Sequence, residues 1–320
     1  MKSLKNTDLK VSNIALGTDC YGTLVSEEAS FEMLDFYKAA GGNLIDTAEA
    51  YARWFENGEH ASELLIGKWL KSRGCRNDII ISTKGGFNWA HEPHHLTYDN
   101  IISDLEGSLK RLGTDCIDIY WLHRDCEALP VSGMMDALNY AVDSGKVRYI
   151  GVSNWTNKRF SEANAYLSQY GKSLFASQMQ YSAASPNYEE NEPLLVVMND
   201  EEYTFFKNCD YTVFAFASQA KGFFSKYIAG GADALSEKAY KRYYNEETLK
   251  RVERLKKVAA DHNISIGAAA ISALCSNYDF DTIPIIGCKN LAQLEDSLSG
   301  GSVAFSKDEI KYIFGRDLSV

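Results

Sequence analysis

The stretch Asp118-Ile-Tyr-Trp-Leu-His123 decides the fold class, because it is an apolar run that ends abruptly in an ionisable residue. Such a run predicts a β-strand that is buried on both faces, as in a parallel sheet. Two earlier apolar runs end in the same way, Asn43-Leu-Ile-Asp46 and Ile79-Ile-Ile-Ser-Thr-Lys84. One amphipathic helix fits into each gap between these runs. Three successive β-α units that each deliver an ionisable group at a strand end indicate a parallel barrel with a site at that end.

The rest of the chain continues this alternation of strands and helices. Further strands are expected at residues 13–16, 147–153, 175–181, 212–216 and 282–286. Residues 1–11 fit a short hairpin that covers one end of the barrel. The predicted fold is a single (β/α)8 TIM barrel of the α/β class that spans residues 1–320, with an N-terminal β-hairpin plug.

Helical periodicity is clearest in one segment after the third strand run. Its apolar residues recur on one face, and a glycine follows at the position typical of helix C-termini. These residues are Ile101, Leu105, Leu109, Leu112 and Gly113. The connection from Ala217 to about Asn245 is instead rich in Gly, Ala, Lys and Tyr. A connection of this length in a barrel is usually functional.

Composition restricts the class of protein. Of the 320 residues 45% are hydrophobic, which is ample for a packed core, and no apolar run reaches membrane-spanning length. The N-terminus does not resemble a signal peptide, and the seven cysteines are scattered without CxxC spacing, as in reduced cytoplasmic proteins. A net charge of −10 argues against nucleic acid as a partner. We therefore expect a cytoplasmic protein without a membrane or nucleic-acid partner, whereas the oligomeric state is not indicated.

Motifs that would indicate other chemistry are missing from the sequence. No GxGxxG follows a predicted strand, which argues against a Rossmann dehydrogenase, and there is no P-loop. His91, His94 and His95 form a cluster, but it lacks an acid-backed ligand pattern such as HExxH, so a solvated loop is the better interpretation. No metal is expected. The strand ends carry neither paired carboxylates nor a metal-ligand set, which argues against a hydrolase or lyase barrel.

The ionisable residues at the predicted strand ends have complementary chemistry. A lysine ammonium beside a tyrosine favours the phenolate and so lowers the pKa of the phenol, and a carboxylate can hold that lysine in place. A neutral imidazole can orient a carbonyl oxygen. Together such groups form a general acid that protonates a carbonyl while a hydride arrives at carbon. The residues are Asp46, Tyr51, Lys84 and His123. Since none of them donates hydride, a cofactor must do so.

Each of these four residues also has an ordinary interpretation when it is taken alone. An aspartate at a strand end often caps a helix, and a lysine there is often a surface charge. A tyrosine in an aromatic loop usually packs, and a histidine at a strand end is more often structural than catalytic. The signal is their joint occurrence on the face where barrels carry their sites.

Four segments resemble the signatures of the aldo-keto reductase superfamily, and the match runs over nearly the whole chain. They are Gly42-Asn-Leu-Ile-Asp-Thr-Ala-Glu-Ala-Tyr51, Ser82-Thr-Lys84, Asp115-Cys-Ile-Asp-Ile-Tyr-Trp-Leu-His123 and Gly145-Lys-Val-Arg-Tyr-Ile-Gly-Val-Ser-Asn154. The resemblance implies an NAD(P)H-dependent carbonyl reductase. It also implies that Tyr51 donates the proton and that Lys84, paired with Asp46, lowers its pKa. His123 would orient the carbonyl group.

The same resemblance places the cofactor NADP(H), with NAD(H) as the alternative. Ser153, Asn154 and Gln178 would hydrogen-bond the nicotinamide carboxamide, and Phe216 would stack on the nicotinamide ring. The loop after Phe216 would follow the pyrophosphate with its backbone N–H groups and a lysine. The predicted cofactor-binding residues are Gly17, Thr18, Asp46, Ser153, Asn154, Gln178, Phe216, Ser218, Gln219, Lys221, Gly222, Gly287, Lys289, Gln293 and Asp296.

The preference for NADP(H) depends on the segment after the last strand. Lys289 lies where an arginine is common in the superfamily, and Gln293 and Ser297 lie where many members have arginine and asparagine. A lysine can contact the adenosine 2′-phosphate as a point charge, but it lacks the bidentate fork of arginine. NADPH is the favoured cofactor on this basis, by a narrow margin over NADH.

Aromatic and charged residues are expected around the barrel mouth. The predicted substrate-binding residues are Tyr21, Trp54, Trp89, Arg124 and Trp155, with Asp19, Phe87 and Asp125 beside them. An aromatic floor with charged groups suits a polar, for example sugar-like, aldehyde or ketone. The alternative is that the aromatic residues pack the loops and the charges form a salt bridge at the rim.

Two classes of function fit the resemblance. The first is a reductase that acts on a small-molecule carbonyl or alcohol substrate. The second is a binding or regulatory protein that keeps the cofactor site but is catalytically weak. The presence of all four strand-end residues favours the enzyme, since fold alone does not determine function.

Overall fold

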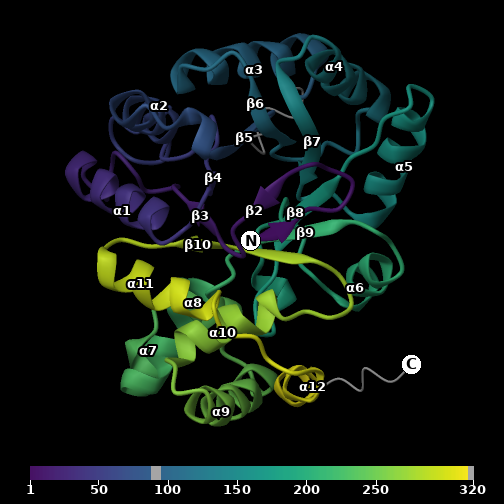
Figure 1. The fold of residues 1–320 in the computed structure, drawn as a ribbon. Coiled ribbons are helices and arrows are strands. Elements are labelled where there is room, and N and C mark those ends of the chain that lie inside the picture. Colours follow the sequence, from purple (N-terminus) through teal and green to yellow (C-terminus); the bar gives the residue numbers. More distant parts are fainter. Residues whose placement is uncertain (88–94, 316–320) are drawn as a thin grey trace.

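Eight parallel strands form a closed barrel with helices around it in the computed structural model, which describes residues 1–87 and 95–315 (Figure 1). Around the barrel the order is β10, β3, β4, β5, β6, β7, β8 and β9, so that the last strand pairs with the first. The strands are β3 (Ala15–Gly17), β4 (Leu44–Asp46), β5 (Ile80–Gly85), β6 (Ile117–Leu122), β7 (Val147–Ser153), β8 (Ala176–Gln180), β9 (Thr212–Phe216) and β10 (Thr282–Gly287). The predicted (β/α)8 fold is confirmed.

The predicted N-terminal hairpin is also confirmed. It consists of β1 (Lys2–Ser3) and β2 (Lys10–Val11), which pair antiparallel. Figure 1 looks onto the end of the barrel that this hairpin crosses. Leu4, Leu9 and Val11 are buried and belong to the same apolar cluster as residues of the barrel interior. Because the hairpin closes this end, the site is expected at the opposite end, where the strands have their carboxyl ends.

Large aromatic side chains fill the barrel interior between the plug and the site. Trp121 of β6 lies 5.6 Å from Phe175 and 4.9 Å from Phe214 between ring centroids. Gly151 of β7 makes room for this indole, because a Cβ atom there would lie only 2.4 Å from Trp121 Cζ3. Trp121 Nε1 donates a hydrogen bond of 2.8 Å to Ser82 Oγ. The packed interior therefore reaches the polar residues at the strand ends.

The outer helices begin and end at residues with the expected capping chemistry. Ser26 accepts the backbone N–H of Ala29 at the start of α1, and Gly113 ends α3 with a φ of 66°. The helices between and after the strands are α1 (Glu27–Ala39), α2 (Ala61–Arg73), α3 (Tyr98–Leu112), α4 (Val131–Asp143), α5 (Asn157–Ser168), α6 (Asp200–Lys207), α9 (Glu246–Asp261), α10 (Ile266–Cys275), α11 (Leu291–Gly300) and α12 (Lys307–Phe314).

The connection after β9 is more ordered than its composition indicated. It contains two short α-helices, α7 (Phe223–Gly230) and α8 (Glu237–Tyr243), and two 3-10 helices, η3 (Ala220–Gly222) and η4 (Gly231–Ala234). Phe223, Phe224 and Tyr243 are buried, and Phe223 and Tyr243 are in edge contact at 6.5 Å. These aromatic anchors hold the connection against the barrel.

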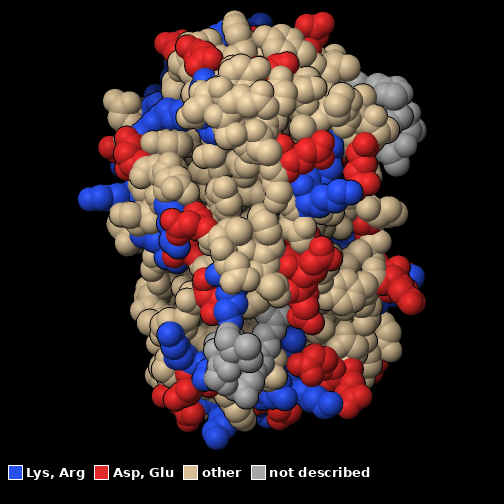
Figure 2. Space-filling model, turned by 90° about the vertical axis from the view of Figure 1, so that its right-hand side faces the viewer, with Lys and Arg blue, Asp and Glu red and all other residues tan. Residues whose placement is uncertain are grey.

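One face of the molecule carries both signs of charge. Figure 2 shows the side of the molecule that lies to the right in Figure 1, where Lys and Arg are interspersed with Asp and Glu.

Within the described ranges, no single helix is long and apolar enough to cross a membrane. The pair α9 and α10, which meet at 94°, passes that test by length and composition only when the two are joined.

Glu202 of α6 links this helix to the start of α5 and makes stability depend on pH. Its Oε1 accepts the backbone N–H of Asn157 at 3.0 Å, while Oε2 is buried without a hydrogen-bond partner among the described residues. Burial raises the pKa of Glu202 to about 7. A carboxyl group with a raised pKa favours the folded state at low pH, and this contribution is lost as pH rises through the folded pKa.

We expect Glu202→Gln to gain stability over the wild type at about pH 8 and to gain none at about pH 5. The amide mimics the protonated carboxyl group and avoids a buried carboxylate at high pH. Urea unfolding at both pH values measures the difference. Glu253→Gln, at an exposed position of α9, is the control. An equal effect of Glu202→Gln at both pH values would contradict the titration.

Candidate active site

Three of the four predicted catalytic residues form one hydrogen-bonded cluster. Lys84 Nζ lies 2.6 Å from Asp46 Oδ2 and 2.8 Å from the Tyr51 hydroxyl. The Tyr51 hydroxyl donates to the same Asp46 Oδ2 at 2.9 Å. The strands explain the proximity, because β4 and β5 are parallel neighbours in which Asp46 pairs with Ser82. Lys84 lies two residues further along β5, so its side chain is on the same face of the barrel as that of Ser82.

Neighbouring polar groups fix the two charges of this cluster. Asp46 Oδ1 accepts hydrogen bonds from Ser82 Oγ at 3.0 Å and from Gln178 Nε2 at 3.1 Å. Lys84 Nζ also donates to the carbonyl oxygen of Thr47 at 2.8 Å. Asp46 and Lys84 have no exposed side-chain surface. The roles of Ser82 and Thr47 were not predicted, although Ser82 is separated from Lys84 by only one residue in the sequence.

His123 completes the predicted set at the end of β6. Its ring lies 5.8 Å from that of Tyr51, at an interplanar angle of 71°. Burial lowers the pKa of His123 well below its usual value, and the positive charges of Arg124 and Lys84 lower it further. The imidazole is therefore neutral at pH 7, as the sequence interpretation requires. Its buried Nδ1 has no hydrogen-bond partner in the described part of the chain.

The pKa of the Tyr51 phenol shifts in the direction opposite to the expected one. Burial raises this pKa well above its usual value, and the negative charges of Asp46 and Asp19 raise it further. Burial also lowers the pKa of Lys84, although Asp46 opposes that shift. The aspartate that holds Lys84 thus shifts the pKa of the phenol in the direction opposite to the one expected from the ammonium. Tyr51 is consequently protonated at neutral pH, which is the form that an acid needs.

The three residues predicted to bind the carboxamide lie together beside this cluster. Ser153 pairs with Gln178 across β7 and β8. Asn154 follows with a φ of 59°, and its Nδ2 donates to Ser153 Oγ at 3.0 Å and to the carbonyl oxygen of His123 at 3.3 Å. Their amide and hydroxyl groups are of the type that a nicotinamide carboxamide requires. Phe216, which ends β9, is half-buried.

The loop after β9 has a backbone suited to an anion. Four of its residues have positive φ, and a concave run of backbone N–H groups in such conformations binds anions. They are Ala217, Ala220, Lys221 and Gly222. Burial, followed by the positive charges of Arg242 and Lys238, lowers the pKa of Lys221. A pyrophosphate fits here, because its negative charge would offset this crowding of cations.

Hydrogen bonds connect that loop to the one after β10. Ser218 Oγ donates to the carbonyl oxygen of Ile285 at 2.6 Å. Gln219 accepts the backbone N–H of Gly287 at 3.1 Å and donates to Ser297 Oγ at 2.8 Å. The predicted pyrophosphate and adenosine segments therefore form one continuous structure.

The segment after β10 leads into the N-terminus of α11. Asn290 caps this helix by accepting the backbone N–H of Gln293, and the Lys289 N–H donates to Gln293 Oε1 at 2.9 Å. Lys289 is exposed, and Asp296 lies half-buried one turn further on. A helix N-terminus next to a lysine favours a phosphate group. Thr18 directly follows the neighbouring strand β3, and its Oγ1 donates a hydrogen bond to the carbonyl oxygen of Asp46 at 3.0 Å.

The predicted cofactor residue Gly17 lies on the neighbouring strand, where it pairs with Asp46 in the register of β3 and β4. A Cβ atom at this position would lie only 2.9 Å from Ile285 Cγ2. The glycine therefore allows β3 and β10 to approach closely at the strand ends.

The predicted substrate residues occupy different environments. Trp54 is 49% exposed and contacts the Tyr51 ring edge-on at 6.5 Å. Tyr21 and Trp155 are at most 1% exposed, and their polar atoms bond to Met33 Sδ and to the carbonyl oxygen of Arg124. Both rings pack the loops in this structure. Trp89 lies outside the described residues.

The predicted histidine cluster is only partly described. His91 and His94 lie outside the described residues, and His95 Nε2 lies 3.2 Å from Asp104 Oδ2. Across residues 1–87 and 95–315, no group of three or more His, Cys, Asp or Glu is arranged to hold a metal ion.

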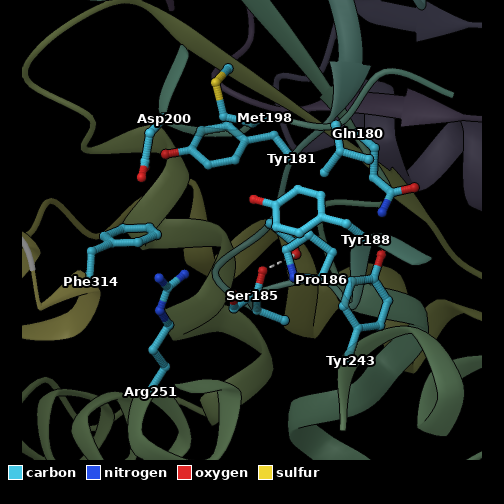
Figure 3. A pocket seen from close by; sticks show the side chains of 13 residues that line it. Gln180, Tyr181, Ser185, Pro186, Tyr188, Met198, Asp200, Tyr243, Arg251 and Phe314 are labelled. Atoms are coloured by element: carbon cyan, nitrogen blue, oxygen red, sulfur yellow. Dashed lines mark hydrogen bonds between the residues drawn. The ribbon is translucent and has the colours of Figure 1, made fainter. Parts of the chain in front are cut away.

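A cavity of about 390 Å³ lies beside the barrel rather than at the Tyr51 cluster (Figure 3). Tyr181, Tyr243, Arg251 and Phe314 are among the residues that line it, and Figure 3 shows the Arg251 guanidinium directed into it. None of the four predicted catalytic residues contributes to its lining.

The fold and the cluster together define a (β/α)8 barrel with an ionisable site at the carboxyl ends of its strands. A family model described as the aldo/keto reductase family matches residues 13–315. The chain belongs to this family. Members act as oxidoreductases on small carbonyl compounds with a nicotinamide cofactor.

Individual relatives agree with this assignment. The chain is 30% identical over 318 residues to the aldo-keto reductase yakc of Schizosaccharomyces pombe, whose name specifies NADP(+), with 93% of this chain and 87% of that protein covered. It is 26% identical over 311 residues to a probable voltage-gated potassium channel subunit beta of Oryza sativa subsp. japonica, with coverage of 93% and 89%. A crystal structure of the thermostable aldo-keto reductase Tm1743 with the inhibitor epalrestat superimposes with a TM-score of 0.71, at 25% identity and 98% coverage of both chains.

Proposed function

We propose that this chain is an NADPH-dependent reductase that converts an aldehyde or ketone into an alcohol. The observation that supports it most is the fully buried Lys84, which contacts both the Asp46 carboxylate and the Tyr51 hydroxyl. A buried ion pair contributes little to stability by itself, so a functional reason for it is favoured. The named NADP(+) dependence of the yeast relative supports the choice of cofactor.

In this proposal each residue of the cluster has one role. The cofactor, when bound, supplies the hydride. Tyr51 donates its hydroxyl proton to the carbonyl oxygen, and Lys84 stabilises the phenolate that remains. Asp46 holds Lys84 in place through the 2.6 Å contact. Neutral His123 orients the carbonyl oxygen, because burial keeps its pKa low.

The same residues support placing the cofactor along the strand ends. Ser153, Asn154 and Gln178 would hold the carboxamide, and Phe216 would cover the ring. The loop at Lys221 would hold the pyrophosphate. We further propose that residues 1–320 form one domain, since the barrel strands extend from β3 to β10 without a break in their pairing.

We expect Lys289→Ala to weaken NADPH binding by roughly tenfold while NADH binding changes by less than about twofold. Lys289 is exposed beside the N-terminus of α11, where a 2′-phosphate would lie. Quenching of tryptophan fluorescence in titrations with each nucleotide measures both constants. Lys307→Ala, on the more distant α12, is the control. An equal loss for NADPH and NADH would remove Lys289 from recognition of the 2′-phosphate.

A second function is suggested by the potassium channel relative, whose name describes a channel subunit. In this interpretation the chain binds the cofactor and has little catalytic activity. The complete and hydrogen-bonded cluster of Asp46, Tyr51 and Lys84 favours the reductase.

The test is to mix the purified protein with NADPH and a panel of aromatic, aliphatic and sugar aldehydes, and to follow the loss of NADPH absorbance. Turnover that needs both NADPH and an aldehyde supports the reductase. Saturable NADPH binding without turnover on any aldehyde would favour the binding protein instead. Absence of nucleotide binding would refute both proposals.

A further inference from the structure

Arg124 is a cation next to the cluster, and it has no partner acid among the described residues. It directly follows His123 at the end of β6, and its Nη1 donates to the carbonyl oxygen of His123 at 2.9 Å. Its guanidinium carbon lies 5.0 Å from the centre of the Phe87 ring, and that ring lies 4.9 Å from the His123 ring. The Phe87 ring therefore contacts both the guanidinium and the imidazole.

The nearest acid in the sequence is already paired with another arginine. Asp125 lies 2.8 Å from Arg159 Nε and 3.0 Å from Arg159 Nη2. Both side chains of this pair are nearly buried, at 10% and 8% exposure. The rim salt bridge among Asp19, Arg124 and Asp125 that the sequence allowed does not form among the described residues, because Asp125 pairs with Arg159 instead. Among the described residues, no carboxylate oxygen lies within 4.0 Å of the Arg124 guanidinium.

The acid with the largest favourable charge interaction with Arg124 is also paired with another arginine. Glu192 is the largest favourable charge on Arg124, yet its Oε1 lies 3.2 Å from Arg242 Nη2. Arg124 is half-buried, and burial lowers the pKa of its guanidinium. Since a guanidinium stays protonated in proteins, its partial burial without a partner acid is costly. The cost is offset when an anion binds to it.

We propose that the substrate carries a carboxylate that Arg124 holds while its carbonyl group lies between Tyr51 and His123. This inference rests on the proposed reductase function and narrows its substrate to aldehydes or ketones that are also carboxylic acids. A guanidinium binds a carboxylate with two parallel hydrogen bonds. A single negative charge suits the site better than a phosphate dianion, because Asp46 and Asp19 also act on Tyr51.

The test compares 4-carboxybenzaldehyde with 4-formylbenzamide, which has nearly the same shape but no charge. Calorimetry measures the binding of each compound to the full chain with NADP(+) present, and NADPH consumption measures kcat/KM. We expect the carboxylate to bind about 10 to 100 times more tightly than the amide and to show a similar ratio of kcat/KM. Arg124→Leu should bring both ratios close to one, and Arg124→Lys should keep part of each.

Matched controls separate this effect from a loss of charge or of fold. Arg73→Leu removes an exposed arginine of α2 that pairs with Asp35, and it should leave both ratios unchanged. Urea unfolding of the Arg124 variants shows whether they remain folded. If Arg124→Leu does not fold, Arg124→Lys, which keeps the positive charge, still tests the inference. Equal binding of carboxylate and amide to the wild type would overturn the inference, even if both aldehydes are reduced. An Arg124-dependent preference without any reduction would instead uphold the anion site and refute the reductase.

Discussion

Tyr51→Phe is expected to lower kcat for aldehyde reduction by about 10² to 10⁴ while NADPH binds as tightly as before. The substitution removes the hydroxyl that contacts both Lys84 and Asp46, at 2.8 and 2.9 Å. The phenyl ring keeps the edge contacts with Trp54 and His123, so the surrounding packing is retained. The affinity should persist because none of the residues proposed to hold the cofactor's phosphates contacts this hydroxyl.

Stopped-flow reduction under single-turnover conditions would measure the chemical step, and a fluorescence titration would measure NADPH binding. Tyr170→Phe is the matched control, because Tyr170 on the outside of the barrel is 47% exposed. A kcat for Tyr51→Phe within about twofold of the wild type would exclude Tyr51 as the proton donor. A parallel loss of NADPH affinity would show that the hydroxyl also positions the cofactor.

The sequence predicted the barrel and its cluster because both depend on local patterns. Buried parallel strands appear as short apolar runs, and an ionisable residue directly after such a run lies at the carboxyl end of the barrel. Asp46, Lys84 and His123 each end such a run, so their convergence followed from topology. Gly113 could also be placed, since a positive φ at a helix end selects glycine.

Other features depend on contacts between distant segments and could not be predicted from local patterns. Helices α7 and α8 have only 8 and 7 residues, too few for a clear periodicity, and tertiary burial of their aromatic residues stabilises them. Tyr21 and Trp155 were expected near the substrate, but a single aromatic residue in a loop does not reveal which way its ring points. Their burial is set by the helices that pack on the barrel.

The direction of the Tyr51 pKa shift is another feature that could not be predicted from the sequence. The presence of a lysine predicted a lowered phenol pKa, but the sequence does not reveal how strongly burial acts. In the structure burial and the Asp46 charge outweigh the neighbouring cations. The balance between these effects depends on depth in the barrel, which is a property of the packed fold.

Asp46→Asn is expected to lower the free energy of unfolding by about 3 to 5 kcal/mol, in addition to abolishing turnover. Asp46 and Lys84 are 2.6 Å apart and both fully buried, so the asparagine leaves an uncompensated ammonium in the barrel. Urea unfolding measures the change. Glu246→Gln removes the acid from the exposed pair with Lys250, and it should not displace the unfolding curve.

The double variant Asp46→Asn/Lys84→Met separates the cost of the lone charge from the loss of the contacts themselves. Removing both partners leaves no buried charge, and Met fills a volume similar to that of the lysine stem, so most of the stability should return. Turnover should not return, since Tyr51 then has no ammonium to stabilise its phenolate. Recovery of stability without recovery of activity would therefore show that the pair is retained for catalysis. If the double variant were as unstable as Asp46→Asn, the hydrogen bonds from Ser82 and Gln178 to Asp46 would have to carry the stability instead.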